Sequence, residues 1–261
     1  MYLLFFVVSF LACVVGSICG IGGGVIIKPV LDATGVMSVS SISFLSGCTV
    51  LSMSMISVSK GLRRDKSVIN FKAVTPLAIG AAIGGVLGKE IFKYAYVILP
   101  SEDKVGAIQA IILVTITLGT LIYTINSSKI KTHHLKNIGA CVIIGLLLGL
   151  ISAFLGIGGG PINIIILAYF FSMGTKQAAI SSLFVIMFSQ LTSFISTMIQ
   201  GDIPKFSLTV LILMVFGGVA GGMIGSKINR KISEKEVKLL FTGLMVVIIF
   251  VNIYNVIKFS I

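Results

Sequence analysis

Hydrophobic residues along the 261-residue chain gather into long runs, separated by short polar or glycine-rich breaks. Six runs approach or exceed the roughly 20 apolar residues that span a bilayer as a helix, and they lie near 40–60, 69–92, 104–125, 176–200, 205–228 and 236–258. Two more long arms each enter a glycine cluster and continue as a shorter apolar arm, at 1–20 with 24–33 and at 136–155 with 160–172. The pattern predicts an all-α, polytopic membrane protein.

The composition agrees with membrane insertion. Mean hydropathy is +1.13 and only 11% of the residues are charged, far less than a soluble domain of this length carries. No separate soluble region remains for an extramembrane active site, so we expect that the protein is not an enzyme. The net charge of +12 resides mainly in short loops, which is typical of membrane topology and argues against a nucleic-acid partner.

Nothing in the chain points to a metal or a cofactor, and we expect neither. The four cysteines lie in apolar segments without a CxxC pair, and we interpret them as packing residues: Cys13, Cys19, Cys48 and Cys141. The two histidines, His133 and His134, adjoin each other in a basic loop.

The chain carries an internal repeat. A shift of 136 residues places the Ile-Gly-Gly-Gly at 21–24 on the same four residues at 157–160. A shift of 137 superimposes two glycine series with four-residue spacing, Gly80, Gly84 and Gly88 on Gly217, Gly221 and Gly225. We predict two structural repeats, 1–130 and 131–261, within a single membrane domain. Glycines four residues apart share a helix face, so each series is interpreted as a packing face.

The basic residues decide between two topologies. If each glycine segment were a simple span, the 20 basic residues would divide equally between the two sides, contrary to the usual cytoplasmic excess. If each segment is a hairpin that enters and leaves on one side, fourteen share a side: Lys60, Arg63, Arg64, Lys66, Lys72, Lys129, Lys131, Lys136, Lys176, Lys227, Arg230, Lys231, Lys235 and Lys238. We therefore predict two inverted repeats, each with a glycine-rich broken-helix hairpin plus three transmembrane helices, and both chain ends outside.

The hairpin turns must be buried, because non-helical backbone inside a membrane persists only where protein or a water-filled cavity surrounds it. Glycine supplies the backbone freedom that such turns need. A short helix follows each turn, opened by Val25 or by Pro161, and Pro29 is expected in the first turn of the first one. Each motif thereby aims a helix N-terminus, with unpaired N–H groups and a positive dipole end, into the protein, where it can bind an anion.

Lys28 strengthens the case for an anion site. It lies well inside an apolar stretch, where insertion of a lysine costs roughly 2.5–3.5 kcal/mol and indicates function. The alternatives are that Lys28 extends to the membrane surface or pairs with Asp32. In the second copy Ile164 replaces Lys28 and Asn163 replaces Ile27, so the site would be asymmetric. The candidate substrate-binding residues are Gly22, Gly23, Gly24, Lys28, Gly158, Gly159, Gly160, Asn163, Ser46, Ser182 and Gln190.

At these residues the chain resembles the TauE/SafE (sulfite exporter) family of membrane proteins. The resemblance covers the full chain and rests on GIGGGVIIKPVL at 20–31 and SAFLGIGGGPINIIIL at 152–167. It implies transport of a small sulfur-containing anion, such as sulfite, sulfoacetate or another organosulfonate, across a prokaryotic cytoplasmic membrane. The family pattern places a proline several residues after the glycines of both halves. Pro29 fits it, whereas the second copy has Pro161 directly after Gly160 and Ile165 at the equivalent position.

These features predict a secondary transporter that moves a small anion by alternating access around the paired hairpins. Its partners would be that anion, the lipid bilayer and a coupling ion, either a proton carried through Asp32 or sodium, and a homodimer stays open. Two alternatives share the same sequence features. One is a passive anion channel, and the other is a membrane scaffold or accessory subunit without substrate, in which the glycines merely pack.

Overall fold

The structure, a computed structural model, describes residues 2–64, 69–99 and 101–260. The first half contains the helices α1 (Tyr2–Cys19), α2 (Gly24–Thr34), α3 (Val39–Arg64), α4 (Phe71–Ile98) and α5 (Glu102–Asn126). After a short 3-10 helix, η2 (Ser127–Lys129), the second half contains α6 (Ile138–Phe154), α7 (Pro161–Phe171), α8 (Thr175–Gln200), α9 (Leu208–Lys231) and α10 (Glu234–Ser260). The predicted all-α fold is confirmed within these residues.

Local sequence signals set the helix boundaries. Gly35 and Gly201 end α2 and α8 in the left-handed conformation, with φ of 65° and 70°. The Asn137 side chain caps α6 by accepting a hydrogen bond from the Ala140 N–H at 3.2 Å. Every predicted helical segment forms within four residues of its expected bounds, except that α4 continues to Ile98, six residues beyond the expected end at 92.

Seven described helices are long and apolar enough to cross a membrane: α1, α3, α4, α5, α8, α9 and α10. The other two apolar helices are shorter, with 17 residues in α6 and 11 in α7. Both α1 and α6 run into buried turns, at 21–24 and 157–160, instead of ending at a surface. Large apolar side chains are exposed along the long helices and suit contact with lipid, among them Ile111, Ile122, Ile212, Phe216 and Phe250. The chain is a multi-pass membrane protein.

The two halves pack extensively on each other. Helix α1 lies along α9, and its counterpart α6 lies along α4. Helix α3 contacts α9 as α8 contacts α4, and two further pairs, α3 with α8 and α5 with α10, join counterparts directly. Exchanging the halves leaves this set of helix pairs unchanged, as expected for two copies of one unit. The repeat boundary near residue 130 stays a prediction.

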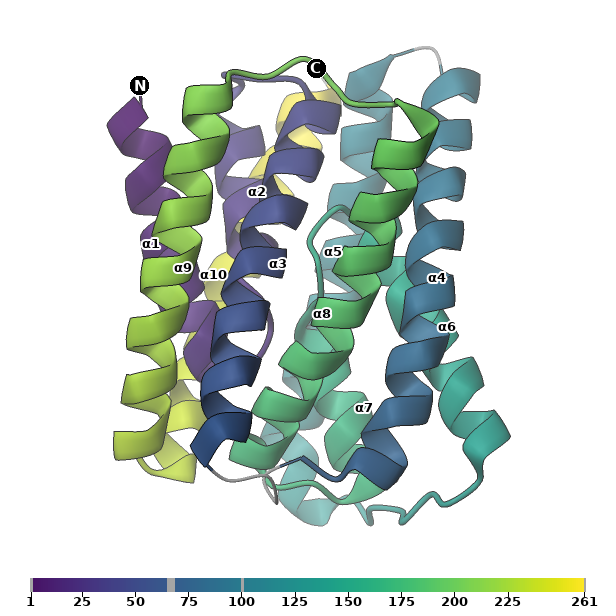
Figure 1. The fold of residues 1–261 in the computed structure, drawn as a ribbon, viewed down its shortest axis with the longest axis vertical. Helices are drawn as coiled ribbons and strands as arrows, with labels where there is room; N and C mark the ends of the chain where they lie inside the picture. Colours follow the sequence, from purple (N-terminus) through teal and green to yellow (C-terminus); the bar gives the residue numbers. More distant parts are fainter. Residues whose placement is uncertain (1, 65–68, 100, 261) are drawn as a thin grey trace.

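Figure 1 shows how the halves run. The N- and C-termini lie at one end of the molecule, here called the terminal end, and α6 starts from the opposite end. Helices α3, α5 and α9 end at that opposite end, and α4, α6 and α10 begin there; it is here called the basic end because most of the basic residues lie near these helix ends. The arrangement fits inverted repeats, whose orientation in a membrane stays a prediction. Lys66, one of the basic residues counted for the topology, lies outside the described residues.

Two glycine seams hold the cross-half pairs together. A Cβ atom on Gly80, Gly84 or Gly88 of α4 would collide with carbonyl oxygens of α6, those of Val142, Leu146 and Leu150. The counterpart series in α9 lies in the same way against the backbone of α1, with Gly217, Gly221 and Gly225 facing Phe6, Phe10 and Val14. Without side chains between them the helices approach until their backbones touch. The interpretation of both series as packing faces is confirmed.

Gly84→Ala should destabilise the folded protein, because the new methyl group overlaps the Leu146 carbonyl and pushes α4 away from α6. We expect a loss of about 1–3 kcal/mol, measured as a lower midpoint of thermal unfolding in detergent. The matched control is Gly119→Ala in α5, where an added Cβ meets no atom within 4 Å and alanine favours the helix. Equal midpoints for the two variants would contradict the packing argument.

Candidate functional site

The two glycine clusters form turns that break a helix in the protein interior. The turn at 20–23 links α1 to α2, and the turn at 155–160 links α6 to α7. Gly22 and its counterpart Gly158 have φ of 77° and 68°, a region that residues with a side chain rarely adopt. Gly159 has φ of 141°, whereas its counterpart Gly23 keeps a helical φ of −70°. The first turn is therefore tighter, and α2 begins directly at Gly24.

The two turns touch each other. A Cβ atom on Gly24 would collide with the carbonyl oxygen of Ile157, and one on Gly159 would lie 3.3 Å from the carbonyl oxygen of Ile21. Segments 136 residues apart in the sequence thus meet backbone to backbone, and all of their glycines except the half-buried Gly156 are buried. The N-termini of α2 and α7 both start from this contact, so two positive helix ends converge inside the apolar protein.

Polar side chains surround the contact, and several have no hydrogen-bond partner. The Ser46 hydroxyl lies 2.9 Å from the position that a Cβ atom on Gly24 would occupy. The Gln190 side chain lies 3.2 Å from the position that a Cβ atom on Gly158 would occupy. Among the described residues, Ser46 Oγ, Ser182 Oγ and Asn163 Oδ1 are buried without a partner. Buried polar atoms normally find a hydrogen-bond partner, so these unpaired oxygens are candidates for contact with a ligand.

Lys28 forms an ion pair instead of facing the turns. Its Nζ lies 2.7 Å from Oδ2 of Asp32, and the two side chains are 3% and 6% exposed. Asp32 is one helical turn farther from the glycines, so the ammonium leans away from them. Lys258 donates to the backbone carbonyl of Asp32 at 3.1 Å. Of the alternatives that the sequence left open for Lys28, the structure has the ion pair with Asp32. A contact between Lys28 and a substrate stays a proposal.

Pro29 lies deeper in its helix than expected. Helix α2 begins at Gly24, which places Pro29 inside the helix and beyond its first turn, so that expectation was wrong. A proline there lacks the N–H that would bond to the carbonyl of Val25. The Asn255 amide on α10 donates to the carbonyl of Pro29 itself at 2.9 Å and ties this part of α2 to α10.

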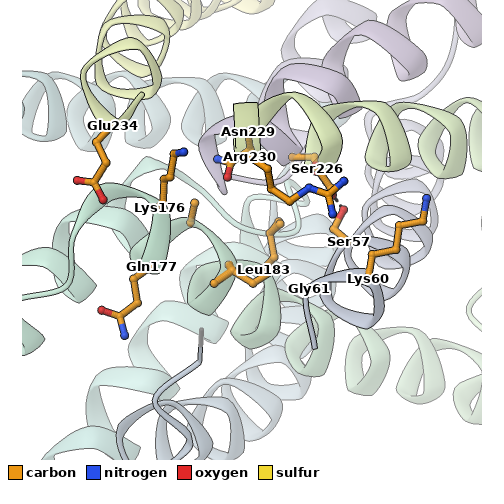
Figure 2. Close-up of a pocket in the computed structure, with 13 residues that line it drawn as sticks. Ser57, Lys60, Gly61, Lys176, Gln177, Leu183, Ser226, Asn229, Arg230 and Glu234 are labelled. Atoms are coloured by element: carbon orange, nitrogen blue, oxygen red, sulfur yellow. Dashed lines mark hydrogen bonds between the residues drawn. The ribbon is translucent and has the colours of Figure 1, made fainter. Parts of the chain in front are cut away.

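A cavity of about 530 Å³ lies at the basic end between α3, α8, α9 and the start of α10. Three basic side chains from three helices line it, Lys60, Lys176 and Arg230 (Figure 2). Its inner wall includes Ala179, which lies directly against the first glycine turn, since a Cβ on Gly20 would be 2.5 Å from the Ala179 Cβ. The cavity therefore leads from the basic end to the edge of the paired turns.

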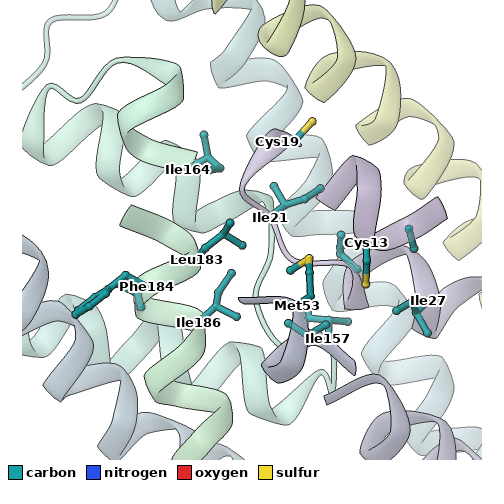
Figure 3. Close-up of a cluster of buried hydrophobic side chains, with 14 of the residues drawn as sticks. Cys13, Cys19, Ile21, Ile27, Met53, Ile157, Ile164, Leu183, Phe184 and Ile186 are labelled. Carbon is teal, nitrogen blue, oxygen red and sulfur yellow. The ribbon is translucent and has the colours of Figure 1, made fainter. Parts of the chain in front are cut away.

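Apolar side chains separate the cavity from the contact between the turns. Leu183 lines the cavity, and Figure 3 shows it grouped with Ile21, Ile157 and Ile186 in the buried cluster. Ile186 also covers the second turn, where its side chain leaves no room for a Cβ on Gly159. A ligand in the cavity would have to displace this layer to reach the polar atoms beside Gly24.

A second cavity occupies the repeat-equivalent position and is nearly closed, at about 30 Å³. Residues that line the large cavity correspond, at a shift of 136 or 137 positions, to residues that line the small one. The corresponding pairs are Ser57 and Ser193, Ala179 and Ser43, Leu183 and Gly47, and Ser226 and Lys89. The small cavity lies towards the terminal end, between the start of α3 and the ends of α4 and α8. The two cavities are therefore copies of one feature, wide on one side of the turns and collapsed on the other.

Aromatic rings line the small cavity, and a surface ion pair links the helices on either side of it. Phe44, which lines it, stacks on Phe194 and Phe206 with ring centroids 6.2 Å and 5.3 Å away. Lys93 of α4 forms an ion pair with Asp202, just beyond α8. These contacts fasten α4 and the end of α8 over the terminal side of the turns.

A third cavity, of about 270 Å³, lies beside α7 at the basic end, and Ile164 and Ala168 line it. The repeat equivalents of these residues are Lys28 and Asp32, whose ion pair lies on α2, towards the terminal end. A buried ion pair therefore takes the place of two apolar side chains on the terminal side.

Sequence reasoning missed several residues of this region. Lys60, Lys176 and Arg230 had been counted for topology alone, because a sequence does not tell which basic residues share a cavity. Val50 and Ile186, which cover the turns, were also missed. The 136-residue shift superimposes Val50 on Ile186, so the repeat itself carried the signal.

Comparison with known proteins connects this geometry to a family. The family described as sulfite exporter TauE/SafE matches residues 5–251, nearly the whole chain. The chain belongs to the TauE/SafE family. It is 23% identical to the probable membrane transporter protein YunE of Bacillus subtilis (strain 168), over 84% of this chain and 87% of that protein. No solved structure matches the chain. The TauE/SafE protein is a membrane transporter and not an enzyme, as predicted.

Lys28→Met should destabilise the TauE/SafE protein by about 3–5 kcal/mol, because it leaves the buried Asp32 carboxylate without its partner. Lys28→Met combined with Asp32→Leu removes both charges and should recover most of the loss. Thermal unfolding midpoints in detergent measure both effects. A single variant as stable as the unmodified protein would contradict a structural role of the pair.

Proposed function

We propose that this TauE/SafE protein is a secondary transporter that moves a small anion by alternating access around the paired glycine turns. The observation that carries the proposal is the pair of repeat-equivalent cavities, about 530 Å³ at the basic end and about 30 Å³ at the terminal end. A carrier exposes its site to one side at a time, and the conformation described here corresponds to the state that faces the basic end.

The turns would hold the anion. Two helix N-termini supply N–H groups and positive dipole ends, and Ser46, Ser182 and Asn163 have polar atoms to offer. Gln190 approaches the second turn from α8. The site would form when the layer around Leu183 and Ile186 moves aside. The same contact between the turns would block free passage when empty, which favours a carrier over a passive channel.

The substrate class follows from family membership and from the charge. We propose a small sulfur-containing anion, such as sulfite, sulfoacetate or another organosulfonate, and a prokaryotic cytoplasmic membrane as the location. A proton or sodium would be the coupling ion. Asp32 is the candidate for proton coupling, since one of its carboxylate oxygens, Oδ1, is buried without a hydrogen-bond partner. A homodimer stays a further proposal.

Reconstituted protein should accumulate labelled sulfite or sulfoacetate in liposomes against its gradient when a proton or sodium gradient is imposed. Gly24→Ala should abolish this transport, because its methyl group drives the two turns apart, while Gly243→Ala, with open space around the added Cβ, should keep it. Transport that only equilibrates the anion would favour the channel. No transport of any such anion would favour the scaffold or accessory subunit.

Cys48 reports on the closed side, since it lines the small cavity and is 8% exposed. In protein whose other three cysteines are replaced by alanine, Asp202→Asn should speed its labelling by a membrane-impermeant thiol reagent added from the terminal end. We expect about a 1.5- to fivefold increase, because an exposed ion pair contributes about 0.2–1 kcal/mol to the closed state. Glu102→Gln, an exposed acid at the same end, is the control. Equal labelling rates in the two variants would contradict the closing role of Lys93–Asp202.

A further inference from the structure

The large cavity concentrates positive charge. Lys60 of α3, Lys176 of α8 and Arg230 of α9 line it, accompanied by one carboxylate, that of Glu234 (Figure 2). In the part of the chain that the structure describes, no carboxylate oxygen lies within 4.0 Å of the nitrogen atoms of these three cations. Three cations that face one hollow, without a close ion pair among the described residues, attract anions more strongly than the same charges spread over a surface.

Only one of the three repeat-equivalent positions on the terminal side carries a cation, although Lys89 also lines the small cavity there. Lys60 corresponds to Ser196 and Lys176 to Ser40. Arg230 corresponds to Lys93, whose amine is already paired with Asp202. The cation cluster is therefore a feature of one side, which the duplicated fold alone does not require.

The cavity continues from the cations to a polar floor. The Ser17 hydroxyl lies 3.0 Å from that of Ser57 and 2.9 Å from that of Ser226, which joins α1, α3 and α9. All three hydroxyls line the cavity, as does Ala179, which abuts the first glycine turn. An anion held by the cations would thus rest on hydroxyl groups at the edge of the turns.

We propose that Lys60, Lys176 and Arg230 form an entry site that binds the anion before it reaches the glycine turns, and that the site prefers doubly charged anions. Three cations and one carboxylate leave a net charge of two, which a dianion neutralises. The entry site rests on the proposed transport function. It differs from the central site because it is already formed in this conformation and needs no displacement of Leu183.

The test is equilibrium binding to purified protein in detergent, with sulfate as the dianion and methanesulfonate as the monoanion. Arg230→Gln or Lys176→Gln should raise the dissociation constant of sulfate about tenfold and that of methanesulfonate about threefold, since removing one charge costs a dianion twice as much. Both effects should shrink in 1 M salt of a weakly bound anion, where the screening length falls to about 3 Å.

Lys231→Gln is the matched control, because Lys231 follows Arg230 on α9 and is exposed, but does not line the cavity. It should leave both constants unchanged. Equal effects of Lys231→Gln and Arg230→Gln would overturn the entry site and leave only a general surface potential. Protein that transports sulfite yet binds no sulfate would overturn it as well. Protein that transports no anion at all would instead overturn the proposed function.

Discussion

The contact between the two glycine turns is the constraint on which the rest of the structure depends. A broken helix exposes backbone N–H and C=O groups, and in a membrane such groups persist only when protein encloses them. Each turn encloses the other, because Gly24 brings its bare backbone against the Ile157 carbonyl. One broken helix alone would have no such partner. The duplication of the motif is therefore a physical requirement of the fold as well as a trace of its origin.

Around this contact the two halves are alike in backbone and different in side chains. The helix pairs exchange into one another when the halves are swapped. Equivalent positions nevertheless carry Lys28 and Ile164, or Lys89 and Ser226. In the proposed alternating-access cycle, a symmetric frame with unequal linings would give two states of unequal energy, and one side would be wide while the other is closed. The differences also leave each side with its own electrostatic character.

Much of this was readable in the sequence. Among the described residues, the ten α-helices follow from apolar runs and glycine breaks, and the glycine seams follow from four-residue spacing. Prediction from the sequence fails where a side chain has more than one possible partner. Lys28 could reach the turns, the membrane surface or Asp32, and only the packing of α2 against α10 decides. Pro29 was misplaced because the first cluster keeps Gly23 helical, a backbone choice that the glycine pattern leaves open. Lys60, Lys176 and Arg230 come from three helices, and their meeting depends on tertiary packing alone.

The pairing of α1 with α9 has a consequence for biosynthesis. The first hairpin leaves the ribosome almost two hundred residues before α9, the helix whose glycine seam packs against α1, is complete. During that interval α1 and α2 must sit in the translocon or at the bilayer surface without their final support. The second hairpin, by contrast, emerges when α4 is already inserted and can dock at once. Two structurally similar units thus fold by different routes, and the contact between α1 and α9 forms only when the last quarter of the chain has been synthesised.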